Sequence, residues 1–130
     1  MKTTKTTVEV LADSVWNGHR ITTFLLHYPR IILAEFNTHR VFGRSTASSR
    51  AIPVAKQIEK IRKGEGYIPD TFGRNQRGMA AHDVLNSVQA SQAQAVWMDA
   101  AEMACLRAEE LATLEVHKQL ANRLLEPFVY

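Results

Sequence analysis

The stretch from Val84 to Ala112 constrains the fold most, because it occupies more than a fifth of the 130-residue chain and has the pattern of a single helix. Small and apolar residues recur along one face of this stretch at helical spacing: Ala93, Trp97, Ala101, Ala104, Ala108 and Leu111. Alanines on such a face let a second helix approach closely. The stretch therefore predicts a long helix that packs against other helices.

A second amphipathic helix is predicted directly after Pro53. Val54, Ile58 and Ile61 share one face of residues 54–62, and Gly64 ends the pattern. A loop over residues 64–78 is expected to follow. Because loops of this length are uncommon in small domains, this one is expected to be functional or mobile.

A last helix is predicted near the end of the chain. Thr113 is its expected N-cap and Pro127 its expected end. Its apolar stripe is predicted to consist of Val116, Leu120 and Leu124. The chain then finishes with three apolar residues, 128–130, which are expected to need a partner surface.

Two β-strands are predicted before these helices. Residues 6–12 and 20–27 are rich in β-forming side chains, and residues 13–18 are expected to connect them. The hydrophobic fraction of 45% suffices for one modest core. We therefore expect a single domain over residues 1–130, of the α/β (α+β) class, with a small antiparallel sheet packed with several helices including the long alanine-rich one.

Charge and cysteine content limit the class of protein. The net charge is only +3, with acidic and basic residues interspersed, so composition alone does not indicate a nucleic-acid partner. Cys105 is the single cysteine, which excludes an internal disulfide and predicts a buried free thiol. No apolar run has the length of a secretory or membrane-spanning segment. A cytoplasmic protein is expected.

A helix of about three turns is predicted between the strands and the most polar stretch of the chain. Pro29 is its expected first residue, and the apolar run that follows ends at Phe36, although a strand is the alternative for so short a run. If the segment is helical, Glu35 and His39 lie on one face, and Arg40 follows at the carboxyl end.

The stretch Asn37–Pro53 concentrates the groups that bind anions. It contains one histidine, three arginines and five hydroxyl side chains. Guanidinium groups bind phosphate oxygens in pairs, and hydroxyls supply further donors, so the stretch predicts a phosphate site. The alternative is a polar turn in which Arg40, Arg44 and Arg50 are solvated surface charges.

Other chemistries receive less support from the sequence. Glu35 and His39 have the spacing of two metal ligands on a helix, but no third ligand sits at an expected offset. Ser48 or Ser49 could act with His39 as in a hydrolase, but the glycines that flank a hydrolase nucleophile are not found beside these serines. A run of cations and aromatics is a candidate nucleic-acid surface, for which a solvated helix face and loop is the preferred reading: Lys56, Lys60, Arg62, Lys63, Tyr67, Phe72, Arg74 and Arg77.

The polar stretch resembles the signature of the flavin-dependent thymidylate synthases. That motif reads Arg-His-Arg, two variable residues, Ser, one variable, Asn-Glu, one variable, Ser, one variable, Arg-Tyr. Four residues match at the right spacing: His39, Arg40, Ser48 and Arg50. The resemblance extends over most of residues 20–127 and is strongest to phage-type members. We therefore expect either the front portion of a longer enzyme or a shortened relative.

Both flanks of the motif add to the resemblance. Glu35 stands where the family commonly has a nucleotide-contacting glutamine. Near the end of the chain, the segment 121–127 is similar to a family helix that carries a nucleotide-binding arginine four residues before a proline, which corresponds to Arg123. Trp97 and the pair His117-Lys118 also resemble family members.

The resemblance implies that dUMP is methylated to dTMP with methylenetetrahydrofolate, FAD and NADPH, without an essential covalent nucleophile from the protein. It implies that His39, Arg40 and Thr46 bind the flavin. It further implies a set of dUMP-binding residues: Glu35, Thr38, Ser48, Ser49, Arg50 and Arg123. Arg123 is expected to come from a neighbouring subunit, because family active sites lie between the subunits of a homotetramer.

Five motif positions carry other residues than the family's, namely Thr38, Gly43, Ser45, Thr46 and Ala51. They define an alternative from another functional class. In that alternative the chain is a catalytically inactive relative that acts as a nucleotide-binding or oligomeric scaffold protein. No metal and no membrane are expected as partners in either reading, and nucleic acid ranks below both.

Overall fold

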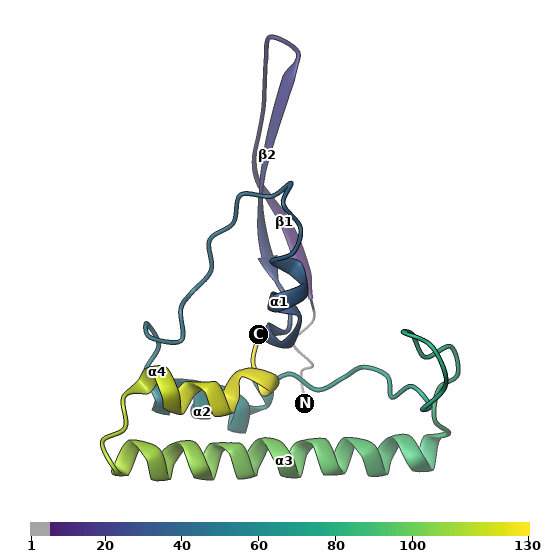
Figure 1. The fold of residues 1–130 in the computed structure, drawn as a ribbon, viewed down its shortest axis with the longest axis vertical. Coiled ribbons are helices and arrows are strands. Elements are labelled where there is room, and N and C mark those ends of the chain that lie inside the picture. Colours follow the sequence, from purple (N-terminus) through teal and green to yellow (C-terminus); the bar gives the residue numbers. More distant parts are fainter. Residues whose placement is uncertain (1–5) are drawn as a thin grey trace.

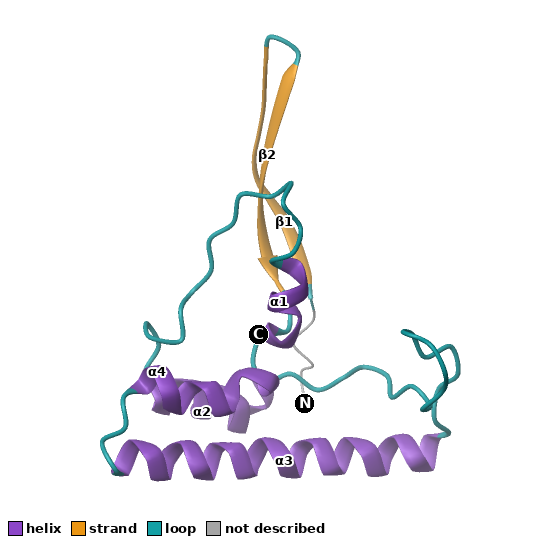
Figure 2. Ribbon diagram, viewed as in Figure 1, coloured by secondary structure: helices purple, strands orange, loops and turns teal. Residues whose placement is uncertain are grey.

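The structure, a computed structural model, describes residues 6–130 and has a mixed α+β fold, which confirms the predicted class (Figures 1 and 2). A two-stranded antiparallel hairpin comes first and short helices follow it, before and after one long helix. The elements in chain order are β1 (Thr7–Trp16), β2 (His19–His27), η1 (Arg30–Ile32), α1 (Leu33–Phe36), α2 (Val54–Lys60), η2 (Ile61–Glu65), α3 (Ser87–Thr113), α4 (Lys118–Ala121) and η3 (Asn122–Phe128).

The hairpin is longer than the sequence pattern predicted. Residues 13–16 belong to β1, so the expectation of a connection over 13–18 is wrong. Cross-strand pairing explains this, because Asp13 lies opposite Thr22 and accepts hydrogen bonds from Thr22 and from Arg20. Only Asn17 and Gly18 form the turn, both with positive φ (47° and 78°), as expected of an Asn-Gly hairpin turn.

We expect Gly18→Ala to weaken the hairpin selectively. An L-residue in the left-handed region costs about 1–2 kcal/mol, and Gly18 has φ +78°. Amide hydrogen exchange in β1 and β2 should therefore accelerate roughly 5- to 30-fold, in proportion to that cost. Gly43→Ala is the control, because Gly43 lacks a positive φ and no atom lies within 4 Å of an added Cβ. Equal exchange in the two variants would contradict the assignment.

The core lies where α2, α3 and the C-terminal helices meet, and the hairpin projects away from it (Figure 1). The predicted long helix is confirmed as the 27-residue α3, which Asn86 caps through a hydrogen bond from the Gln89 backbone. The small buried residues of α3 allow this close packing. The core cluster consists of Val54, Ile58, Cys105, Ala108, Ala121 and Leu125. Cys105 is a buried free thiol, as predicted.

The predicted register of the last helix is wrong. Thr113 ends α3 instead of capping the next helix, and its hydroxyl donates to the carbonyl of Glu109 at 3.0 Å. The chain reverses at Glu115, whose φ is 60°, and His117 is the N-cap of α4. Because the helix begins after this reversal, the face turned to the core changes. Leu120 and Leu124 are exposed.

The apolar chain end is covered by the chain itself. Phe128 and Val129 are buried, and their carbonyls accept hydrogen bonds from the backbones of Tyr67 and Arg30, both at 2.9 Å. Tyr130 stacks on His27 with ring centroids 4.7 Å apart. The expectation that this end needs a partner surface is therefore wrong for Phe128 and Val129. Their burial ties the chain end to the base of the hairpin.

The molecule exposes far more surface than its mass requires. Its accessible area is 9976 Å², whereas a folded monomer of 14.7 kDa exposes about 6,900 Å². The projecting hairpin contributes to this excess, since Val15, Trp16 and Ile21 are all at least 67% exposed. Such an excess, about 3,000 Å², is of the size that obligate subunit interfaces bury.

Candidate functional site

The helix that precedes the polar stretch is much shorter than predicted. Pro29 precedes the first turn instead of being its first residue, residues 30–32 form a 3₁₀ turn, and α1 ends at Phe36. None of the helical residues is buried. His39 lies beyond the helix, in a turn where its backbone N–H donates to the Phe36 carbonyl at 3.2 Å. The predicted three-turn buried helix with Glu35 and His39 on one face is therefore wrong.

The first half of the polar stretch, residues 37–46, is held by Arg44. Its guanidinium donates to the backbone carbonyls of Phe36 and His39 and lies 6.0 Å from the centroid of the Phe36 ring. The Thr38 hydroxyl donates to the Glu35 carbonyl at 2.7 Å. His39 and Arg40 are exposed. Arg44 is thus committed to the protein, while the side chains of His39 and Arg40 face solvent.

The second half, residues 47–52, is anchored to η3. Asn122 is 3% exposed, and its Nδ2 donates to the carbonyls of Ser49 and Ile52, both at 2.8 Å. The Ser49 hydroxyl donates to Oε1 of Glu126 at 3.1 Å, and Arg30 donates to the Ala47 carbonyl at 3.1 Å. Because residues 47–52 form neither helix nor strand, these side-chain contacts fix their position.

A tight turn gives the three residues Ser48, Ser49 and Arg50 different surroundings. The Ala51 backbone donates to the Ser48 carbonyl at 2.9 Å, and the Arg50 backbone donates to the Ser48 hydroxyl at 3.2 Å. Ser49 is only 7% exposed, whereas Ser48 and Arg50 are exposed. The turn therefore holds Ser49 inward and leaves Ser48 and Arg50 accessible to a ligand.

Arg123 lies beside this turn of its own chain, whereas the family resemblance implied that it reaches the site of a neighbouring subunit. Its Nη1 donates to both oxygens of Glu126, each at 3.2 Å, and Glu126 also accepts from Ser49. A single carboxylate thus links Arg123 to the Ser48–Arg50 turn. The sequence reasoning missed Arg30, Asn122 and Glu126. Only Glu126 left a signal, its spacing of three residues from Arg123 on a helix.

A cavity of about 770 Å³ separates β2 from residues 41–46. The rings of Phe24, Phe36 and Phe42 line it, together with Thr46. This volume falls within the range of small-molecule sites. Of the three predicted flavin-binding residues, Thr46 lines the cavity, whereas His39 and Arg40 do not. Glu35, Ser48 and the other predicted dUMP-binding residues also lie outside it.

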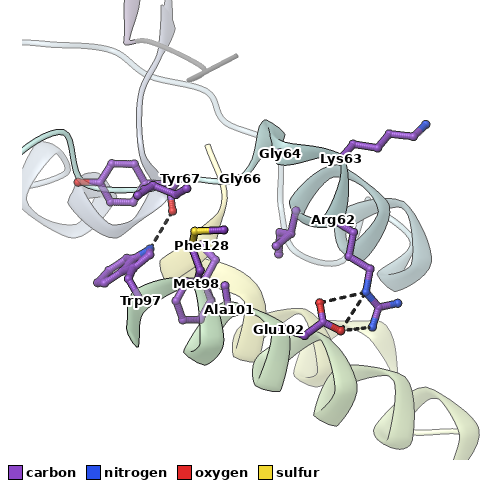
Figure 3. A pocket seen from close by; sticks show the side chains of 12 residues that line it. Arg62, Lys63, Gly64, Gly66, Tyr67, Trp97, Met98, Ala101, Glu102 and Phe128 are labelled. Atoms are coloured by element: carbon purple, nitrogen blue, oxygen red, sulfur yellow. Dashed lines mark hydrogen bonds and ion pairs between the residues drawn. The ribbon is translucent and has the colours of Figure 1, made fainter. Parts of the chain in front are cut away.

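A second cavity, of about 300 Å³, lies between α3 and the segment that follows η2 (Figure 3). Tyr67, Trp97 and Phe128 form its aromatic side, where the Trp97 indole N–H donates to the Tyr67 carbonyl at 2.9 Å. Burial raises the pKa of the Tyr67 phenol above its ordinary value, and the nearby Asp70 carboxylate adds to this shift. None of the predicted flavin-binding or dUMP-binding residues lines this cavity.

Two of the six cations in the candidate nucleic-acid run, Arg62 and Lys63, are paired with glutamates. Arg62 donates to Glu102 and Glu109 on α3, and Lys63 pairs with Glu59. These hydrogen bonds raise the pKa of Arg62 above its ordinary value, and the bond from Arg62 lowers the pKa of Glu109. The paired charges favour the reading of a solvated face over a nucleic-acid surface, because neutralised cations attract phosphates weakly.

The described residues contain neither a metal-ligand cluster nor a long apolar helix. Across residues 6–130, no three His, Cys, Asp or Glu side chains gather as ligands for an ion. In the same range, no helix has both the length and the apolar character needed to span a membrane.

Comparisons with protein-family models, curated proteins and solved structures found no match to this chain.

Proposed function

We propose that this protein is a flavin-dependent thymidylate synthase-like protein that methylates dUMP to dTMP with methylenetetrahydrofolate, FAD and NADPH. The observation that carries the proposal is the placement of Arg123 beside the Ser48–Arg50 turn, through their shared partner Glu126. The family resemblance assigns these residues to one ligand, with Arg123 contributed by a neighbouring subunit. Here they lie together within a single chain, so that each copy offers Arg50 and Arg123 to one phosphate.

The chemistry of these residues suits a nucleotide phosphate. Arg50 and Arg123 are exposed cations, and the Ser48 hydroxyl lies in the same turn as Arg50. A guanidinium binds two phosphate oxygens at once, so two of them fix the orientation of the phosphate as well as its position. Orientation of the nucleotide is the main contribution to rate that this chain's residues offer. The Ser49 hydroxyl supports the turn from the inside.

The donors near the larger cavity fit a flavin nucleotide. The Phe36 and Phe42 rings offer apolar faces, Thr46 offers a hydroxyl, and His39 with Arg40 offers exposed donors at the preceding turn. FAD, when bound and reduced by NADPH, would supply the hydride needed to complete the methyl group. The chain's own part is to bind the cofactor and to hold it near the nucleotide.

The proposed active form is a homo-oligomer. The excess surface and the exposed apolar residues of the hairpin are expected to be covered by further copies of the chain. We further propose a cytoplasmic location, where reducing conditions keep the buried Cys105 as a thiol.

Ligand-dependent stabilisation tests the proposal directly. Ligands that bind only the folded state raise the thermal midpoint, so we expect it to rise with dUMP and with FAD at millimolar concentration. Adenosine monophosphate at the same concentration is the control for any phosphate-bearing nucleotide. A midpoint that moves with neither dUMP nor FAD contradicts the proposal.

A second candidate is a catalytically inactive relative that binds nucleotide on an oligomeric scaffold. Thr46 and Ser45 favour it, because they replace the family's Glu and Asn and so remove a charged and an amide group from the motif. Tritium release from C5-labelled dUMP, with NADPH and methylenetetrahydrofolate present, separates the two candidates. Release above the rate without protein eliminates the inactive relative, and binding without release supports it.

A further inference from the structure

Glu126 accepts hydrogen bonds from three separate parts of the chain. Its Oε1 accepts hydrogen bonds from Arg30 Nε at 3.3 Å, from the Ser49 hydroxyl at 3.1 Å and from Arg123 Nη1 at 3.2 Å. Its Oε2 accepts a second bond from Arg123 Nη1. The side chain is 26% exposed, so solvent weakens these bonds less than at an open surface. One carboxylate therefore orders several donors at once.

The contact between Glu126 and Ser49 fixes the turn that bears Ser48 and Arg50. Asn122 and Arg30 hold the backbone of residues 47–52 through carbonyl groups, whereas Glu126 holds it through the Ser49 hydroxyl. Loss of the Glu126 carboxylate leaves the carbonyl contacts intact. We therefore expect the turn to stay folded but to sample more orientations.

The contact between Glu126 and Arg123 leaves the arginine able to bind a ligand. Only Nη1 of Arg123 is used, and within residues 6–130 its Nε and Nη2 make no hydrogen bond. The side chain is 59% exposed. An arginine held at one nitrogen loses less rotamer freedom when it binds an anion with the others. The Glu126 carboxylate also offsets part of the positive charge of Arg123, and this effect opposes anion binding.

The negative charge of Glu126 weakens anion binding, whereas its hold on Arg123 and on the Ser48–Arg50 turn strengthens it. The change in anion affinity on removal of the carboxylate therefore shows which effect is larger. If Glu126 acts mainly as a nearby negative charge, replacing it with a neutral side chain tightens anion binding. If it acts mainly by holding Arg123 and the Ser48–Arg50 turn in place, the same replacement weakens binding.

We propose that Glu126 is a positioning residue that holds Arg123 and the Ser48–Arg50 turn in the arrangement that receives the dUMP phosphate. The proposal rests on the proposed function, since it names dUMP as the ligand. Ser49 then acts through Glu126 rather than by touching the nucleotide. Arg30 has the same supporting role, because its guanidinium contacts both Glu126 and the Ala47 carbonyl.

The test compares dUMP binding by calorimetry in the wild type, Glu126→Gln, Arg123→Gln and the double variant. We expect Glu126→Gln to weaken dUMP binding about tenfold in the wild-type background. The loss should be clearly smaller in the Arg123→Gln background, where only the hold of Glu126 on the Ser48–Arg50 turn is left to lose. Glu110→Gln is the matched control, since Glu110 also pairs with an arginine three residues away, Arg107, but on α3. It should leave binding unchanged.

Two outcomes overturn the proposal: tighter or unchanged binding in Glu126→Gln, and an equal loss in both backgrounds, which indicates a general structural role. Hydrogen exchange of residues 47–52 without ligand is the second measurement. It should accelerate in Glu126→Gln and not in Glu110→Gln, and equal exchange overturns the proposal even if one variant binds poorly. Failure of the wild type to bind dUMP at all instead overturns the proposed function.

Discussion

Replacement of Arg50 by alanine is expected to lower the affinity for dUMP by roughly 10- to 150-fold while leaving the folded protein nearly as stable as the wild type. Hydrogen bonds from a charged group contribute about 1.5–3 kcal/mol, and Arg50 is exposed. Within residues 6–130, the hydrogen bond that anchors Arg50 comes from its backbone N–H to the Ser48 hydroxyl, and alanine retains it. Calorimetric titration with dUMP and urea denaturation measure the two quantities.

Arg77→Ala is the matched control for charge in this comparison. Arg77 is an exposed arginine in the loop between η2 and α3, far along the chain from the polar stretch. Its replacement by alanine removes the same charge. Its affinity for dUMP should equal that of the wild type. If Arg50→Ala instead unfolds at markedly lower urea with unchanged affinity, Arg50 has a structural role and the phosphate assignment is wrong.

The position of the candidate site could be predicted from the sequence, but its internal architecture could not. The density of arginines and hydroxyls in Asn37–Pro53 marks the stretch without any structure. Which hydroxyl turns inward depends on contacts with Asn122 and Glu126, which lie more than 70 residues away and leave no local pattern. Ser48 and Ser49 are identical in sequence terms, yet only Ser49 is buried.

The fold was predictable where local patterns are long, and it was mispredicted where a single residue changes the chain direction. The regular spacing of alanines sufficed to identify α3. The hairpin turn carried a short signal, Asn17-Gly18, that the polar residues of the neighbouring strand obscured. At the last helix, the positive φ of Glu115 reverses the chain and shifts the N-cap from the expected Thr113 to His117. Neighbouring residues of the 3₁₀ helix η3 lie about 120° apart around its axis, so Leu124 and Leu125 face different sides.

The same shift yields a sharp prediction about stability, because it exchanges the roles of two neighbouring leucines. Leu125 is 1% exposed and packs in the core cluster, whereas Leu124, which the sequence pattern placed in the apolar stripe, is 40% exposed. Leu125→Ala should lower the free energy of unfolding by about 2–5 kcal/mol, since it removes buried methyl groups and leaves a cavity. In a domain with a total stability of about 5–15 kcal/mol, this is a large fraction.

Leu124→Ala removes the same atoms from the adjacent position and should cost under about 1 kcal/mol, because surface substitutions rarely cost more. Urea denaturation of the two variants at equal protein concentration measures the difference. An equal loss in both variants would mean that Leu124 is buried against a second copy of the chain. The loss for Leu124→Ala would then shrink on dilution, because the wild type loses the same contact when the copies separate. A larger loss for Leu124→Ala than for Leu125→Ala would restore the register expected from the sequence and contradict the core described for α4 and η3.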